Sequence, residues 1–141
     1  MTVRILVPVD SSATTAHTIA AIIAHRERFP DPLLLLHVID VERFAYRMIP
    51  DFQREMIRQS ALKAGEQLLR GLQLQLLEAG LQAEVRLESG APRQLVCRIA
   101  NDEAFDLLIL GRRGSGEIRD VLFGTVANYA LHNVRCPVLL F

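Results

Sequence analysis

The residues with the clearest chemical potential form a glycine-rich segment near the C-terminal end of the chain. Gly111, Gly114 and Gly116 lie close together, and Gly124 and Thr125 follow at the expected start of a helix. Glycine lets backbone N–H groups approach an anion closely, and a helix N-terminus adds free N–H donors with a partial positive charge. The threonine hydroxyl is a further donor. Together these groups suit a di- or triphosphate.

The same glycines also have a purely structural interpretation. Gly111 could simply close the turn after a strand, and Gly124 could simply begin a helix, so the glycines alone leave both interpretations open. Other phosphate motifs can be excluded. The chain has no G-x-x-x-x-G-K-[ST] run, so it is not a P-loop NTPase. The first expected strand is not followed by G-x-G-x-x-G, which disfavours a dinucleotide-binding Rossmann domain. Cations that could offset phosphate charge are Arg112, Arg113 and Arg119.

The hydrophobic pattern predicts the scaffold that would position these residues. Apolar runs without alternation are typical of strands buried on both faces of a parallel sheet, and segments with helical spacing separate them. The expected strands are Val3–Val9, Leu33–Ile39, Ala83–Glu88, Leu107–Leu110 and Pro137–Phe141. The expected helices start after Ser11 or Ser12, cover Asp51–Ala79, begin at Pro92 and run from Thr125 to Asn133, and Asp40–Pro50 is expected to be a loop.

Alternating strands and helices predict an α/β fold. We expect one doubly wound, Rossmann-like domain over residues 1–141, with a five-stranded parallel sheet in the order 3-2-1-4-5 and helices on both faces. Gly65 and Gly71 inside the second helix each disfavour helix, so a bend or break is possible there. In such sheets ligands bind beyond the C-terminal ends of the strands, where the strand order reverses.

Composition excludes several functions. The formal net charge of zero argues against a nucleic-acid binder that works by bulk charge. The apolar runs are too short to span a bilayer and the start has no signal-peptide pattern, so a soluble, cytoplasmic protein is expected. Cys97 and Cys136 lack metal-ligand spacing, which predicts reduced thiols and no zinc. The histidines form no catalytic arrangement, and His37 is interpreted as a packing or hydrogen-bonding residue. No catalytic or metal-ligating residue is therefore predicted.

The sequence resembles the universal stress protein family over its whole length. The spacing Gly111-x2-Gly114-x9-Gly124-Thr125 looks like the G-2x-G-9x-G-[S/T] signature of the ATP-binding members. Further similar segments are ILVPVD (Ile5–Asp10), LLHVID (Leu35–Asp40), GAP (Gly90–Pro92) and VRCPVLLF (Val134–Phe141). One departure is Ser11, where many relatives carry glycine after the aspartate.

The resemblance implies a set of binding roles. Residues matching Asp10 and Val38 hold the adenosine, Val38 through its backbone. Residues matching Gly111 and Gly114 lie along the ribose and phosphates, and the next two motif residues bind the phosphate tail, often with Mg²⁺ or Mn²⁺. The nucleotide-binding residues expected from the resemblance are Pro8, Val9, Asp10, Val38, Leu110, Gly111, Arg113, Gly114, Gly124, Thr125 and Val126.

Three functions follow as hypotheses. The favoured one is a regulatory ATP-binding module of the universal stress type, which would act by changing its contacts with a protein partner. The second is a slow ATPase, or an enzyme that transfers nucleotidyl or phosphoryl groups on the same fold. The third is a nucleotide-free scaffold, which the glycine signature disfavours. An apolar strand at a sheet edge invites pairing, so we also expect a homodimer through residues 137–141, with no nucleic-acid or membrane partner.

Overall fold

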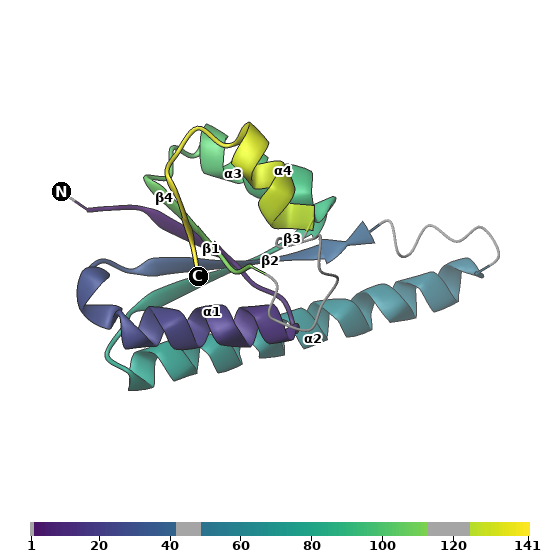
Figure 1. The fold of residues 1–141 in the computed structure, drawn as a ribbon. Coiled ribbons are helices and arrows are strands. Elements are labelled where there is room, and N and C mark those ends of the chain that lie inside the picture. The colour runs from purple at the N-terminus through teal and green to yellow at the C-terminus, as the bar shows by residue number, and fades with distance from the viewer. Residues whose placement is uncertain (1, 42–48, 113–124) are drawn as a thin grey trace.

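The computed structural model describes residues 2–41, 49–112 and 125–141. Within these ranges strands and helices alternate along the chain (Figure 1). The strands are β1 (Ile5–Pro8), β2 (Leu33–Asp40), β3 (Ala83–Gly90), β4 (Leu107–Leu110) and β5 (Val138–Leu140). The helices are α1 (Ala13–Ala24), α2 (Asp51–Glu78), α3 (Pro92–Asp102) and α4 (Thr125–Asn133), and a short 3₁₀ turn, Arg26–Arg28, follows α1.

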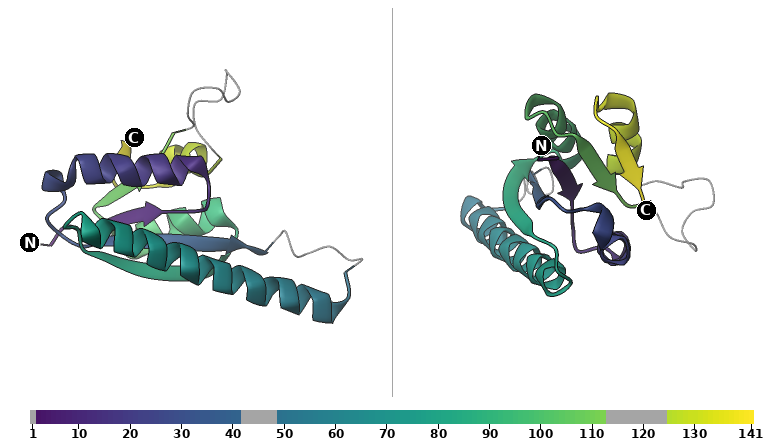
Figure 2. Two further views of the ribbon diagram at one scale, coloured as in Figure 1. Left: turned by 90° about the horizontal axis from the view of Figure 1, so that it is seen from below. Right: turned by 90° about the vertical axis from the view of Figure 1, so that its left-hand side faces the viewer.

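The strands form one parallel sheet in the order β3-β2-β1-β4-β5, as the sequence predicts. Helices α1 and α2 cover one face and α3 and α4 the other, which Figure 2 shows with the sheet between the two pairs. The chain starts in the centre at β1, builds outward to β3, and then returns to β4 on the other side of β1. The strand order therefore reverses between β1 and β4, where ligands of such sheets bind.

The central strand explains why both faces need helices. Ile5, Leu6 and Val7 of β1 are at most 4% exposed. Because successive side chains of a strand point to opposite faces, Leu6 packs in the core with residues of α3 and α4. Its two neighbours pack in the core with residues of α1 and α2. The predicted strand with two buried faces is confirmed.

Helix α2 is continuous for 28 residues and shows no break at its two glycines. Gly71 has open space around it, whereas a side chain at Gly65 would lie 2.9 Å from Leu87 and 3.0 Å from His37. Gly65 therefore allows the helix to lie close to the sheet. The N-terminal end of α2 extends beyond the strands (Figure 1), and Phe52 and Met56 on it are exposed.

The element ends differ slightly from expectation. β1 covers Ile5–Pro8 rather than Val3–Val9, β3 continues to Gly90, and Asp40 is the last residue of β2 rather than the first of a loop. Most of the expected loop, residues 42–48, lies outside the described residues. None of the described helices is long and apolar enough to cross a membrane.

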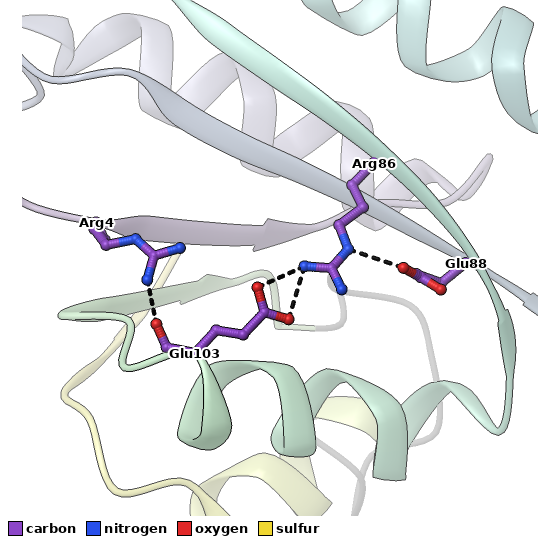
Figure 3. A network of polar contacts seen from close by, with 4 residues as sticks. All are labelled: Arg4, Arg86, Glu88 and Glu103. Carbon is purple, nitrogen blue, oxygen red and sulfur yellow. Dashed lines mark hydrogen bonds and ion pairs between the residues drawn. The ribbon is translucent and has the colours of Figure 1, made fainter.

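A polar network joins the edge strand β3 to the end of α3 (Figure 3). The Arg86 Nε donates to Glu88 at 2.9 Å, and its Nη1 donates to both carboxylate oxygens of Glu103 at 2.8 Å. These hydrogen bonds raise the pKa of Arg86 and lower the pKa of Glu103. Arg4 donates to the Glu103 carbonyl and lies over the Phe105 ring. The network thus connects three elements at a partly exposed surface, where ion pairs contribute modestly.

Candidate functional site

A cleft of about 740 Å³ opens at the C-terminal ends of β1, β2 and β4. This volume falls within the usual range for small-molecule sites, roughly 300–1,000 Å³. The structure brings together in its wall seven residues that the sequence predicts as binding residues: Pro8, Val9, Asp10, Val38, Leu110, Gly111 and Val126. Arg113, Gly114 and Gly124 lie outside the described residues, and Thr125 is the first residue of α4.

The turn from β1 into α1 is held by the Asp10 side chain. Its Oδ1 accepts from the Ser12 N–H at 2.9 Å, from the Ser12 hydroxyl at 2.5 Å and from the Thr15 hydroxyl at 2.9 Å. Ser12 in turn caps α1 by accepting from the Thr15 N–H, although the 3.4 Å distance is long. Oδ2 accepts no hydrogen bond from the residues that the structure describes. One oxygen therefore fixes the turn, and the other has no partner within the part of the chain that the structure describes.

These bonds also set the charge state of Asp10. Burial alone would raise the pKa of this carboxyl, but the hydrogen bonds from Ser12 and Thr15 outweigh burial, and His37 adds a smaller electrostatic contribution. The net result is a pKa below the ordinary aspartate value. Asp10 is therefore ionised at neutral pH and offers a hydrogen-bond acceptor to hydroxyl groups.

Ser11 fits the turn without backbone strain. Among the described residues, positive φ angles occur at Ala104 (53°) and Gly80 (87°) only. The backbone of Ser11 therefore does not need the left-handed conformation that favours glycine. The departure from the family pattern at this position is compatible with the turn seen here, and Ser11 itself lines the cleft.

Position 111 requires glycine because helix α1 lies close to the backbone there. A side chain at this position would meet the Thr14 methyl at 2.7 Å and the Thr14 carbonyl at 3.2 Å, and would come still closer to the Thr18 hydroxyl. Thr18 has little freedom to move away, because it is 3% exposed and donates to the Thr14 carbonyl at 2.8 Å. The first glycine of the motif thus has a packing role besides the close ligand approach that the sequence indicates.

The N-terminus of α4 adjoins the cleft. The helix begins at Thr125, and Val126 and Ala127 in its first turn line the cleft. The first backbone N–H groups of a helix lack partners within the helix and carry partial positive charge. An anionic end of a ligand in the cleft would be stabilised by this helix end.

Other lining residues were not predicted from the sequence. Three threonines of α1 line the cleft, Thr14, Thr15 and Thr18, as do Ala61, Ala64, Gly65 and Leu68 of α2 and Pro92 and Val96 of α3. A usable signal was present, because small residues at positions 61, 64 and 65 recur at helical spacing and mark a face with room beside it. What the sequence could not show was that this face lies over the ends of β1 and β2.

His37 is a hydrogen-bonding residue, as predicted. Its Nδ1 lies 2.8 Å from the Val9 carbonyl oxygen. A carbonyl can only accept, so Nδ1 carries the proton and donates. The two cysteines are free thiols in this structure, with Cys97 buried and Cys136 partly exposed, and burial raises the pKa of both.

The fold and the cleft define a class of protein. The chain is an open, doubly wound parallel α/β domain with a ligand-sized cleft at the point where the strand order reverses. Comparison with known proteins adds the family: the sequence profile of the universal stress protein family matches residues 1–141. The chain belongs to the universal stress protein family.

Individual relatives agree with this assignment. The universal stress protein Sll1388 of Synechocystis sp. is 27% identical over 148 residues, which cover 97% of this chain and 96% of the relative. Among solved structures, protein MJ0577 of Methanocaldococcus jannaschii superposes with a TM-score of 0.82 at 23% identity, covering 97% of this chain and 93% of its own. A universal stress protein family protein of Arabidopsis thaliana with AMP bound gives 0.72 at 22% identity, covering 99% and 90%. The two structural likenesses show the fold.

Proposed function

We propose that this protein is an ATP-binding regulatory member of the universal stress protein family. The observation that carries the proposal is the convergence of Asp10, Val38 and Gly111 on one cleft of about 740 Å³ at the switch point of the sheet. These residues come from three different strand ends, and the sequence motif that continues from Gly111 ends at the first residue of α4.

Three features of the cleft support a nucleoside triphosphate as its ligand. The free oxygen of Asp10 is an acceptor for ribose hydroxyls. Val38 and Val96 give the cleft apolar surface for a base. The N-terminus of α4 supplies donors for phosphates. The AMP bound to the Arabidopsis thaliana relative supports a nucleotide as the ligand class.

A divalent cation is part of the proposal. Among the described residues, no group of three or more His, Cys, Asp or Glu side chains is placed to hold a metal. Mg²⁺ commonly binds through substrate phosphates with few protein ligands. We therefore assign Mg²⁺ or Mn²⁺ to the phosphates of the bound nucleotide, where it would offset their charge.

The role we propose is regulation by nucleotide state rather than rapid catalysis. The motif lacks the lysine of P-loop enzymes, and typical enzymes turn over roughly 1–1,000 times per second. The alternative is a slow ATPase or a nucleotidyl- or phosphoryl-transferring enzyme. A phosphate-release assay separates the two, because sustained turnover above about 1 per second would establish an enzyme. Mass spectrometry of ligand released from the purified protein identifies the bound nucleotide.

We further propose a homodimer through the C-terminal strand. β5 is an edge strand paired on one side with β4, and its residues are partly exposed. A two-fold axis would let this edge pair with its own copy and satisfy both edges at once. Phe141 packs within its own chain and stacks on His25 with ring centroids 5.7 Å apart. The competing possibility is therefore that the edge of β5 stays solvated in a monomer. We also propose that the protein is cytoplasmic. We propose further that a second protein binds it differently with and without nucleotide.

A further inference from the structure

His37 lies where the ladder between β1 and β2 ends. The paired residues run from Ile5–Leu33 to Pro8–Leu36, and one more hydrogen bond follows, from the Val9 N–H to the Leu36 carbonyl at 2.8 Å. In a parallel ladder the next bond would run from the Val38 N–H to the Val9 carbonyl. No hydrogen bond joins these two groups. The Val9 carbonyl accepts from the His37 side chain instead.

The Val38 N–H does not point toward β3 on the other side of β2. The hydrogen bond from the Leu33 N–H to the Gln82 carbonyl shows that residue 33 donates toward β3. N–H groups alternate in direction along a strand. Those of residues 35 and 37 therefore also point toward β3, and that of Val38 points toward the end of β1, where the cleft lies.

The imidazole is held in place from both sides. Its Nδ1 is bound to the Val9 carbonyl, and its Cδ2 edge faces Gly65 of α2 so closely that a side chain there would lie 3.0 Å from it. Gly65 itself is buried. A side chain at position 65 would therefore crowd both the imidazole and Leu87.

From this geometry we propose that His37 is a positioning residue that keeps the Val38 N–H free as a donor for a ring nitrogen of the bound purine base. The carbonyl that would continue the ladder accepts from the imidazole, and in this arrangement it does not accept from the Val38 N–H. The inference rests on the proposed nucleotide function and adds the residue, His37, that keeps the Val38 N–H available to the base. His37 does not need to touch the ligand to do this.

A matched pair of variants tests the proposal. In His37→Asn the amide nitrogen takes the place of Nδ1 and can still donate to the Val9 carbonyl, whereas His37→Leu has no donor. We expect His37→Asn to bind ATP like wild type. His37→Leu should bind ATP about three- to tenfold more weakly, the effect of one neutral hydrogen bond. Binding of tripolyphosphate, which has no base, should be the same in both. Equal ATP affinity in wild type and His37→Leu would overturn the proposal.

Amide hydrogen exchange at Val38, followed by NMR without ligand, tests the ladder directly. The Val38 amide should exchange rapidly in wild type and slowly in His37→Leu, because the freed Val9 carbonyl then accepts it. Equal exchange rates would also overturn the proposal. This measurement needs no nucleotide, so it remains decisive even if wild type fails to bind ATP, a result that would count against the proposed function instead.

Discussion

The Thr15 hydroxyl joins Asp10 at two points, accepting from its backbone N–H and donating to its Oδ1, both at 2.9 Å. Thr15 is 7% exposed, whereas Asp10 is exposed, so both bonds are partly shielded from water. This reciprocal contact ties the first turn of α1 to the segment that connects β1 with α1. It links the stability of the domain to the orientation of a cleft carboxylate.

Replacing Thr15 with valine should therefore destabilise the fold. The change keeps the side-chain shape but removes the acceptor of the partly buried Asp10 N–H and a donor to the Asp10 carboxylate. Such hydrogen bonds contribute about 0.5–3 kcal/mol each. Urea unfolding measures the loss. The matched control is Thr14→Val, because the Thr14 hydroxyl makes no hydrogen bond with the described residues. Equal unfolding free energies for the two variants would show that the contact with Asp10 is not stabilising.

The pKa of Asp10 predicts a pH dependence of stability. Its pKa is lowered in the folded state, so the unfolded chain binds the proton more tightly. The stabilisation from this carboxylate is fully present above the unfolded pKa of about 4 and is lost as the pH falls through the folded pKa. The difference in unfolding free energy between wild type and Asp10→Asn should shrink on acidification. A difference that stays constant between neutral and strongly acidic pH would contradict this account.

Gly111→Ala should destabilise the domain even without ligand. The new methyl would meet Thr14 and Thr18 of α1, and overpacking of this kind typically costs about 1–3 kcal/mol. Gly71→Ala is the control, because nothing lies within 4 Å of a methyl at that helical position. That variant should be stabilised by up to about 1 kcal/mol. Thermal or urea unfolding of both proteins checks the contrast, and a Gly111→Ala variant as stable as wild type would refute the packing role.

The dimer prediction calls for a substitution at Leu140. The Phe141 N–H donates to the Leu110 carbonyl of β4, so by alternation the Leu139 N–H also points inward, and the N–H groups of Val138 and Leu140 point to the open edge. Leu139→Pro would damage the sheet itself, whereas Leu140→Pro removes an outward donor. Light scattering should show a dimer for wild type and for Leu140→Ala, and a monomer for Leu140→Pro. A monomeric wild type, or a dimeric Leu140→Pro, would exclude this interface.

Much of the fold could be predicted because the pattern is strong at each strand. The buried runs at β1, β2 and β4 have few alternative structures, and Pro92 begins α3 where its fixed φ fits. The sequence left a bend or break possible at Gly65 and Gly71 because glycine disfavours helix. The observed α2 is continuous, and at Gly65 it packs closely on His37 and Leu87. Helix propensity depends on residues near one another in the sequence, whereas the contact of Gly65 with His37 and Leu87 joins residues that are far apart in the sequence.

The site was predicted in part for a similar reason. Motif residues at strand ends could be placed because parallel strands end at a common edge. The threonines of α1 and the small residues of α2 could not, because their position depends on how each helix crosses the sheet. The point at which the hydrogen bonds between β1 and β2 end could not be predicted either, because it depends on a single side-chain hydrogen bond from His37 to the Val9 carbonyl.

Calorimetric titration of ATP with Mg²⁺ tests the central claim most directly. Wild type should bind one ATP per chain. Gly114→Val and Gly124→Val, chosen on the sequence motif because both positions lie outside the described residues, should bind much more weakly. Thr125→Ala should lose about 1.5–3 kcal/mol, the contribution of a hydrogen bond to a charged group. Wild type without measurable ATP binding, or both glycine variants binding like wild type, would contradict the account.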